Sequence, residues 1–592
     1  CEGMRFEAIA QYQILFEVMN PDLPQSSPSI SIEASGTVEY ISEALKRPSQ
    51  VSGIETDLFG VADAADALFV MIPLFEEARI AQDNFLSRAR NLITVTFMSN
   101  IDLSEEHDAF ISICCISSAE VRDSMIVTVE KTDNSRDVAL PSFCFDSIGT
   151  GGTNIVHFND TTFGVQMYLC PFSGNKISSW SEFSVSFYVN NPDFNRNSPA
   201  ISISATANTP ASGIAALLME KPGTTVRGVS NGDDPMEIVV PEFLTTLAGQ
   251  STPVSGAANT ITVTFQVSVD LSGSDSSIIT LTNLSGAILE SSVPLEAVSG
   301  GPSGSNLFCD DSGQNRLGMW DDTMSSLKLK LCQEQTMHVG QQYAFSFVVT
   351  NPQHDQESPR IMIEASGDFV NMLPAPLVKS DAAILGISNG ASPLKVVVPL
   401  FTSKTMAQST PISSVSNVIT VTLKSTIDLS NSMSATITIS NLHGLVRSGS
   451  TISMVDVAGQ AKMSDLMCFG PTPKLTVWDQ QKSHILLTVC AGATLKHSID
   501  YVFAFTITNP GQDQDSPPIA VGASCSMAVI PAMPMDKPNE YVVGVANGSD
   551  PLKIVVPIFN DKTVSQSTPL PGFDNTIRLF LRSSINLAAE DE

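Results

Sequence analysis

Residues 343–367 read YAFSFVVTNPQHDQESPRIMIEASG, and variants of this stretch occur four times in the chain. Apolar and polar side chains alternate on both sides of a polar loop flanked by prolines, which predicts two strands that each bury one face. The Asn-Pro pair within the stretch recurs at spacings of 171, 160 and 158 residues, with its asparagine at Asn20, Asn191, Asn351 and Asn509. A period this long, kept over three intervals, predicts a tandem array of modules rather than one large globule.

A second phrase keeps the same period. NLITVTF, NTITVTF, NVITVTL and NTIRLFL begin at Asn91, Asn259, Asn417 and Asn575. β-branched residues alternate with polar ones in these runs, as is typical of strands, and Asn-Gly turns such as Asn389-Gly390 supply residues that tolerate positive φ. The sequence therefore predicts an all-β chain of β-sandwich modules, with about four units of roughly 160 residues.

Residues that recur in register suggest where the units begin. The predicted units are 1–142, which is divergent and N-terminally truncated, 143–307, 308–466, and 467–592, which is C-terminally truncated. The two halves of a unit resemble each other, which favours two small lobes per unit; one larger sandwich per unit is the alternative. Helix is expected only at Ser42–Lys46 and around Ala211–Glu220, and residues 4–16 are predicted as strand from their repeat position.

Cysteines recur once per unit as pairs separated by 26, 23 and 22 residues. This register predicts three disulfides formed in an oxidising compartment: Cys144–Cys170, Cys309–Cys332 and Cys468–Cys490. Zinc is disfavoured, because the chain has no C-x-x-C motif and no repeated histidine. Cys1 lies 19 residues before Asn20 and resembles the second member of a further pair, whereas Cys114, Cys115 and Cys525 fall outside the pattern.

The net charge is −30, from 31 basic and 61 acidic residues. Such a surface repels phosphates and anionic lipid, so we expect neither nucleic acid nor direct membrane contact. Solubility is the simple explanation of the charge; tolerance of salt or weak binding of divalent cations is the alternative. The longest apolar run, at 67–75, is too short to span a bilayer. Without an initial Met or a visible signal peptide, the chain is expected to be an internal piece of a longer protein.

Motifs of catalysis are lacking in the sequence, and none of its seven histidines recurs in every unit. There is no G-x-S-x-G elbow, H-E-x-x-H helix or phosphate-binding glycine loop, so we do not expect an enzyme. Acidic pairs occur at Asp233-Asp234, Asp310-Asp311 and Asp321-Asp322. Calcium needs six or more converging oxygens, so solvated turns are favoured and no cofactor is predicted, with weakly bound calcium left open.

Other residues suggest packing or modification. Trp320 and Trp478 are 158 residues apart and each lies 12 residues before a cysteine, which favours core packing over sugar stacking; Trp180 is out of register and a candidate for an exposed contact. Three sequons predict N-glycosylation, at Asn159, Asn283 and Asn547. The Asn-Pro asparagines are predicted to be structural, with side chains bonded to loop backbone.

The phrases YAFSFVVTNP…SPRIMIEASG and NVITVTL…TIDLS…ATITISNL resemble repeats of very large secreted or cell-surface proteins of algae and other protists. The resemblance covers nearly the whole chain. It implies tandem extracellular β-sandwich modules of the immunoglobulin-like kind and no reaction. Some proteins of this type build surface coats or hair-like appendages on cilia.

These observations lead to two functional hypotheses. The first is a structural subunit of an extracellular filament, ciliary hair or cell-surface coat, built as a disulfide-stapled rod and partnered by copies of itself or by other coat or filament proteins. The alternative is an adhesin or receptor ectodomain that binds glycan or protein through loops of one unit. The divergent first unit is the candidate for that role, since it has ADAADA at 62–67 where the others have a glycine-containing turn. Both hypotheses place the protein outside the cell or on its surface, including the ciliary surface.

Overall fold

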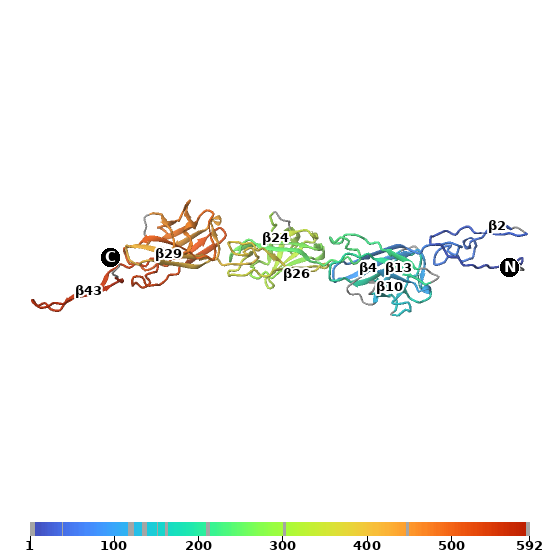
Figure 1. The fold of residues 1–592 in the computed structure, drawn as a ribbon, viewed down its shortest axis with the longest axis horizontal. Coiled ribbons are helices and arrows are strands. Elements are labelled where there is room, and N and C mark those ends of the chain that lie inside the picture. The colour runs from blue at the N-terminus through green and yellow to red at the C-terminus, as the bar shows by residue number, and fades with distance from the viewer. Residues whose placement is uncertain are drawn as a thin grey trace. The chain divides into compact units, whose positions relative to one another are not determined.

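The computed structural model describes residues 6–37, 40–116, 124–132, 139–150, 152–159, 164–208, 213–299, 304–445 and 449–587. Within these ranges the chain is all-β and contains three complete sandwiches, which confirms the predicted fold class (Figure 1). Helical structure in the described ranges is limited to one-turn 3-10 segments, and none of it is long and apolar enough to cross a bilayer.

The first sandwich has a strand that connects its two sheets. One sheet contains β3 (Phe75–Gln82), β4 (Arg90–Ser99), β12 (Phe183–Asn190) and β7 (Ser124–Lys131). The other contains β14 (Ile214–Leu218), β13 (Ser202–Thr206), β6 (Phe110–Cys114), β10 (Gly164–Leu169), β9 (Ile155–Asn159) and β8 (Phe143–Cys144). β7 pairs antiparallel with both β12 and β9. The alternating apolar residues of both sheets meet in one core that includes Phe97, Ile111 and Phe187.

The second and third sandwiches repeat this plan. The second is built from β15 (Phe243–Gln250), β16 (Ala258–Val267), β18 (Ile278–Thr282), β19 (Ser292–Pro294), β20 (Phe308–Cys309), β21 (Leu317–Asp321), β22 (Ser326–Leu331), β24 (Tyr343–Thr350), β25 (Met362–Ser366) and β26 (Met372–Pro376). The third is built from β28 (Phe401–Gln408), β29 (Ser416–Ser425), β31 (Thr436–Ser440), β32 (Thr451–Ser453), β33 (Val455–Asp456), β37 (Leu475–Asp479), β38 (His484–Val489), β40 (Tyr501–Thr508), β41 (Ala520–Ser524) and β42 (Val529–Pro534).

Two-stranded hairpins occur near both ends of the described chain. They are β1 (Ser31–Ala34) with β2 (Tyr40–Ala44), and β43 (Phe559–Gln566) with β44 (Ile577–Ser583). The remaining short strands are β5 (Leu103–Ser104), β11 (Lys176–Ile177), β17 (Leu271–Ser272), β23 (Thr336–Met337), β27 (Val378–Lys379), β30 (Leu429–Ser430), β34 (Ala461–Lys462), β35 (Met467–Phe469), β36 (Thr472–Pro473) and β39 (Thr494–Leu495). The 3-10 turns are η1 (Pro48–Gln50), η2 (Glu105–His107), η3 (Gly273–Asp275), η4 (Ser305–Leu307), η5 (Asn431–Met433) and η6 (Ser464–Leu466).

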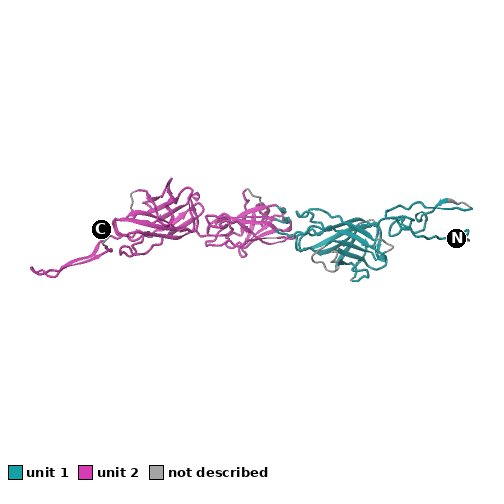
Figure 2. Cartoon of the chain, in the orientation of Figure 1, with its two compact units in different colours: residues 1–242, 267–271, 337–340 teal, residues 243–266, 272–336, 341–592 magenta. Residues whose placement is uncertain are grey.

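The chain divides into two compact units (Figure 2). The first comprises residues 1–242, 267–271 and 337–340 and contains the first sandwich; the second comprises residues 243–266, 272–336 and 341–592 and contains the third sandwich and the β43–β44 hairpin.

The sandwiches do not coincide with the units predicted from sequence. The central strand pairs β4–β12, β16–β24 and β29–β40 cross the predicted boundaries at 142/143, 307/308 and 466/467. Each sandwich combines the second half of one predicted unit with the first half of the next. A predicted unit therefore contains neither two small sandwiches nor one complete sandwich. The period determines the length of a module, but a repeating sequence does not show at which residue the module starts.

Three local predictions also need correction. Neither Ser42–Lys46 nor the described part of Ala211–Glu220, residues 213–220, is helical: β2 includes residues 42–44, β14 includes residues 214–218, and these strands pair antiparallel with β1 and β13. Pairing with a neighbouring strand outweighs the helix preference of their Ala, Leu and Glu residues. Residues 6–16, the described part of the stretch 4–16 predicted as strand, belong to no strand, and neither do residues 17–24. Their counterparts β12, β24 and β40 pair with a hairpin from the preceding repeat, whereas no described hairpin pairs with residues 10–24.

Candidate functional site

Each sandwich contains a buried group of three amide side chains, which we call the amide cluster. In the third sandwich, Asn417 Nδ2 donates to Gln408 Oε1 over 3.0 Å and to Asn509 Oδ1 over 2.9 Å. Asn509 Nδ2 donates in turn to the carbonyl oxygens of Thr410 and Ile412, over 3.2 and 2.7 Å. The clusters of the first and second sandwiches have the same amide-to-amide bonds and consist of Gln82, Asn91 and Asn191, and of Gln250, Asn259 and Asn351.

Asn191, Asn351 and Asn509 therefore bond to loop backbone, which is the kind of contact that the sequence predicts. The loop, however, belongs to the preceding repeat: Asn191 donates to the carbonyl oxygens of Asn84 and Leu86, and Asn351 to those of Thr252 and Val254. Asn20, the first of the four, lies in the exposed segment 10–24, where no hairpin of the described chain meets it.

The glutamine of each cluster holds the segment that follows the sandwich. We call this the connecting segment; it covers residues 222–239, 380–397 and 538–555. Gln408 Nε2 donates to the carbonyl oxygens of Gly548 and Lys553, over 2.9 and 2.7 Å, and its Oε1 accepts the N–H of Leu552 over 2.9 Å. Gln82 and Gln250 make the same three bonds with their own connecting segments. The amide clusters thus fix the connecting segments to their sandwiches.

A second contact, which we call the Asp–Gly joint, bonds a loop that contains a glycine to an Asp or Asn further along the chain. In four places an Asp or Asn lies 42 residues after a glycine: Gly60 and Asp102, Gly228 and Asp270, Gly386 and Asp428, Gly544 and Asn586. The N–H of each Asp or Asn donates to the carbonyl oxygen of the residue before that glycine, over 2.7, 3.0, 2.7 and 2.9 Å. The spacing and the bond are the same in all four joints.

Glycine is required in the joint for two reasons. The four glycines have φ values of +72°, +77°, +79° and +74°, a conformation that other residues rarely adopt. In addition, a Cβ at any of these positions would meet the Asp or Asn side chain closer than real Cβ contacts allow. A larger residue would therefore strain the backbone and push the joint apart.

The joint aspartate is bonded in its own sandwich as well. Asp428 accepts the N–H of His497 over 2.7 Å and an Nζ hydrogen of Lys496 over 3.0 Å, and His497 Nδ1 lies 2.9 Å from its Oδ1. Burial by itself would raise the pKa of Asp428, but these bonds from His497 and Lys496 outweigh burial and lower the pKa below its usual value. Asp102 and Asp270 likewise accept backbone N–H groups, from Ser179 and Val339, each over 2.7 Å.

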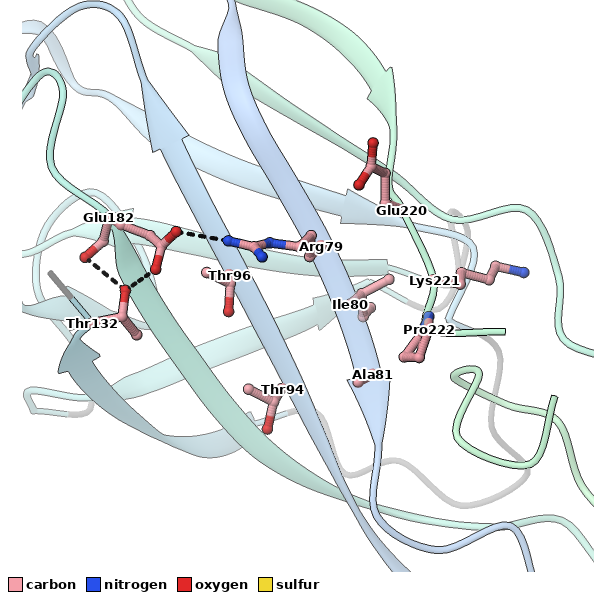
Figure 3. A pocket seen from close by; sticks show the side chains of 10 residues that line it. All are labelled: Arg79, Ile80, Ala81, Thr94, Thr96, Thr132, Glu182, Glu220, Lys221 and Pro222. Carbon is pink, nitrogen blue, oxygen red and sulfur yellow. Dashed lines mark hydrogen bonds and ion pairs between the residues drawn. The ribbon is translucent and has the colours of Figure 1, made fainter. Parts of the chain in front are cut away.

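The first sandwich has a charged surface groove of about 450 Å³ (Figure 3). Arg79 of β3 donates to Glu182 over 2.8 Å, and the Thr132 hydroxyl also bonds to Glu182. The other lining residues are Ile80, Ala81, Thr94, Thr96, Glu220, Lys221 and Pro222. A groove of about 340 Å³ lies at the same place on the second sandwich, where Leu247 and Val378 replace Arg79 and Glu220. The groove recurs with one of its charges, since Lys379 corresponds to Lys221, but the second groove has no counterpart of Arg79, Glu182 or Glu220 that is charged.

The cysteine pairs predicted from register are joined in the structure. Cys144–Cys170, Cys309–Cys332 and Cys468–Cys490 have Cα–Cα distances of 4.9, 5.1 and 5.0 Å. Each bond attaches a short strand, β8, β20 or β35, to the end of β10, β22 or β38. Of the cysteines left unassigned by the sequence, Cys114 and Cys115 are bonded to each other and Cys525 is free; Cys1 lies outside the described residues.

The predicted aromatic sites differ in environment. Trp478 is buried in the core of the third sandwich. Trp320 is only partly buried, with Nε1 3.4 Å from Asp322 Oδ1, so the two tryptophans in register do not share one role. Trp180 is exposed.

Two of the predicted glycosylation asparagines can be located. Asn283 and Asn547 are exposed, but Asn283 Nδ2, the atom that would carry a glycan, donates to the carbonyl oxygen of Arg360 over 2.9 Å. In the Asn547 sequon, Ser549 is buried and bonded to Glu540. The side chain of Asn159 and the rest of its sequon lie outside the described residues.

The acidic pairs contain carboxylates that bind turn backbone. Asp233 and Asp234 accept the N–H groups of Thr224 and Gly223, and Asp310 and Asp321 accept N–H groups from residues two to four positions later. Among the described residues, no group of three or more His, Cys, Asp or Glu side chains is placed to hold a metal ion.

Sequence reasoning missed the glutamines of the amide clusters and both partners of the Asp–Gly joint. The signal was present, because Gln82, Gln250, Gln408 and Gln566 keep the repeat period, as do the joint residues. A histidine search was less useful: His338 and His497 accompany joint aspartates, and the others lie elsewhere.

Comparison with known proteins gives no family. No family model and no curated protein matches the chain. Among solved structures, the Streptococcus agalactiae AgI/II polypeptide BspA C-terminal domain aligns at 8% identity with a TM-score of 0.29, covering 52% of this chain and 99% of that one. The collagen adhesin CNA from S. aureus aligns at 10% identity with a TM-score of 0.14, covering 51% and 90%. A biofilm-associated protein BSP domain aligns at 8% identity with a TM-score of 0.17, covering 91% and 99%. Likeness at this level supports no conclusion about the function of this chain.

Proposed function

We propose that this chain is a structural subunit of an extracellular filament or surface coat, in which β-sandwiches are linked in series through firm joints. The observation that carries the proposal is the Asp–Gly joint, which recurs four times with one spacing and one bonding pattern. The joints keep the same spacing and the same bond along the chain, whereas the side chains that line the surface grooves differ. This is the pattern expected of a protein whose task is to connect and bear load.

The third joint illustrates how firm such a connection is. The loop 384–387 is bonded to Asp428 on one side, and Gln250 holds the same connecting segment on the other. Asp428 and Gln250 are both buried. Bending at this point would expose or orphan these polar groups, and each buried group left without a partner costs about 1–3 kcal/mol. The joint therefore resists deformation.

The chemistry of the chain agrees with an extracellular location. Three in-register disulfides suit an oxidising compartment. With a net charge of −30, nucleic acid and anionic lipid are poor partners, so copies of this chain or other coat proteins are the proposed ones. The resemblance to algal and protist repeats extends the proposal to the ciliary surface.

Electron microscopy of native material tests this function. We expect an antibody against the third sandwich to label a polymer or coat at regular intervals. Separate copies scattered on a surface, with no lateral or end-to-end neighbours, would contradict the proposal.

A matched pair of glycine variants tests the joint itself. Gly386→Ala places a Cβ against Asp428, whereas Gly492→Ala introduces similar backbone strain, at φ +75°, with no atom within 4 Å. Small-angle scattering of the full chain should show increased flexibility only for Gly386→Ala. Equal behaviour of the two variants would mean that the joint does not stiffen the array.

Adhesion through the groove of the first sandwich is the second candidate. It is favoured by the charged side chains Arg79, Glu182 and Glu220, which the groove of the second sandwich lacks. Arg79→Leu introduces the residue found in the second sandwich. If adhesion is the function, this variant should lose binding to the target surface while the chain remains folded; retained binding would exclude the groove.

A further inference from the structure

Strand β14 is at one edge of its sheet in the first sandwich, and that edge is open. The sheet continues from β14 to β13 and β6, and no other described strand pairs with β14. Four of its five side chains are exposed, among them Leu217 and Leu218, which are 40 and 67% exposed. An open edge with exposed apolar side chains is a place where another strand can add.

The backbone of Leu218 faces this open edge. Leu218 lies opposite Ser202 of β13 in the register, and the next N–H, that of Met219, donates to the carbonyl oxygen of Ile201 over 2.9 Å. Backbone groups of successive residues in a strand point to opposite sides, so the N–H and C=O of Leu218 point away from β13. A strand that added to β14 would bond to them.

The equivalent edges of the other two sandwiches are protected by proline. In register with Leu218, β26 has Pro376 and β42 has Pro534. Each of these strands also has a second proline, Pro374 or Pro531. Proline at the position of Leu218 removes no bond within the sheet, but it removes the donor that a further strand needs. β14 reads IAALL, so the first sandwich alone among the three lacks this protection.

The open edge does not result from a missing neighbour in the array. The third sandwich follows a complete second sandwich in the chain, and its strand β42 is still the last strand of its sheet. Thr402 and Pro534, which correspond to Glu76 and Leu218, are exposed there. A preceding module therefore leaves this edge uncovered.

A groove of about 530 Å³ lies beside the edge, and we call it the β14 groove. It is lined by Phe75, Glu76, Glu77, Ala78, Arg79, Leu217, Leu218 and Glu220. Three of these residues are glutamates, and the one base, Arg79, already bonds to Glu77 and to Glu182. The β14 groove therefore combines an apolar wall with excess negative charge.

This acidity belongs to the first sandwich. The counterparts of Glu76, Glu77 and Glu220 are Leu244, Thr245 and Val378 in the second sandwich, and Thr402, Ser403 and Asp536 in the third. Asp536 is the one acid among these six, and it is paired with Lys404 over 3.0 Å. The same sandwich thus has both the edge without proline and the acidic groove beside it.

We propose that β14 is the docking edge for an extended segment of a basic partner protein. The segment adds to β14 as a further strand, bonds to the main chain of Leu218, and places lysine or arginine side chains against Glu76, Glu77 and Glu220. A second copy of this chain is a poor occupant, because each copy has a net charge of −30. The proposal deepens the proposed function and rests on it for its role, since it gives the chemistry of a coat partner.

Binding of a short labelled peptide in which valine and lysine alternate tests the proposal. Fluorescence anisotropy with the full-length chain, disulfides intact, should show binding, and a peptide with glutamate in place of lysine should not bind. Leu218→Pro introduces the residue of the second and third sandwiches and should weaken binding about tenfold or more, because it removes the outward N–H. Leu218→Ala keeps that N–H and is the matched control, with binding weakened less than about threefold.

A second pair of variants tests the charges. Glu76→Gln combined with Glu220→Val should weaken binding of the lysine peptide about fivefold and reduce its dependence on salt, since two carboxylates near the peptide are lost. Glu290→Gln removes an exposed carboxylate from the second sandwich and should bind like the unmodified chain. Methylating alternate backbone nitrogens of the peptide tests the main-chain bonds without changing the protein, and should also abolish binding.

Three results would overturn the proposal: a lysine peptide that does not bind, equal binding by Leu218→Pro and Leu218→Ala, or full binding of the methylated peptide. Self-association of the unmodified chain that Leu218→Pro abolishes would assign the edge to a second copy instead. The test is separate from that of the proposed function. Peptide binding by a protein found as scattered single copies would keep the docking edge and reject the filament, whereas a native filament whose chain ignores the peptide would do the reverse.

Discussion

The hairpins β28–β29 and β43–β44 have the same register and opposite surroundings. Met406 pairs with Val421 and Val564 with Leu579, and both hairpins shift register at the same place near their first residue. The loop bonds around Asn417 and Asn575 also match. Yet the core-facing side chains are buried in one hairpin and exposed in the other. The register is therefore the same whether or not the hairpin is covered, whereas burial of its apolar face depends on a strand from the next repeat.

Charge substitution at equivalent core positions should have the largest effect. Val421→Asp buries a carboxylate in the third sandwich and should destabilise it by about 4 kcal/mol or more. Leu579→Asp, at an exposed position, should change the stability of the folded chain by less than about 0.5 kcal/mol. Hydrogen exchange along a denaturant series, read segment by segment, distinguishes them. Similar losses would show that the β44 face is buried in solution.

The disulfide of the third sandwich gives the next largest effect. Its loop spans 22 residues, so replacing Cys468 and Cys490 by Ser should lower the stability of that sandwich by about 3 kcal/mol in the chain-entropy view. Exchange of the β43–β44 hairpin should not change. The same replacement at Cys309 and Cys332 is the control and should weaken the second sandwich instead. Peptide mapping without reductant checks the pairing, and free thiols at these positions would refute both the pairing and the oxidising compartment.

Removing the central amide should destabilise the two hairpins by different amounts, and this difference in stability should be smaller than the preceding ones. Asn417→Ala leaves Gln408 Oε1 and Asn509 Oδ1 each without one donor, and should cost about 1–3 kcal/mol. Asn575→Ala removes an exposed amide and should cost less than about 0.5 kcal/mol. Denaturant unfolding of the two variants measures the difference. A large loss in Asn575→Ala would mean that its cluster is already complete.

Acid should weaken the third joint more than the fourth. The folded-state pKa of Asp428 lies below its usual value, so its contribution is fully present above the ordinary aspartate pKa and is lost as pH falls through the folded pKa. Asn586 occupies the same place after β44 and has no proton to gain. Stability of the third sandwich should thus fall in acid, and Asp428→Asn should flatten the dependence. An unchanged pH profile in Asp428→Asn would assign the acid sensitivity to another group.

Local pattern was sufficient for part of this structure. Alternation in 343–350 and 418–423 predicts strands that the structure contains as β24 and β29, and the register of the cysteines pairs them as the structure does. The amide clusters and the joints were harder to predict, because Gln408 and Gly548 are 140 residues apart. The sequence shows that these residues recur with the repeat period, but it does not show which residues they contact.

By itself, the sequence determined the all-β class, the period, the cysteine pairing and the structural role of the Asn-Pro asparagines, because each follows from residues that repeat or alternate locally. Only the tertiary structure decided where a sandwich begins and which residues meet at a joint. It also decided that residues 12–19 and β44 are exposed while their counterparts in β40 and β29 are buried. The physical reason is that alternation shows which face of a strand is apolar, but the burial of that face depends on a partner strand that is distant in sequence.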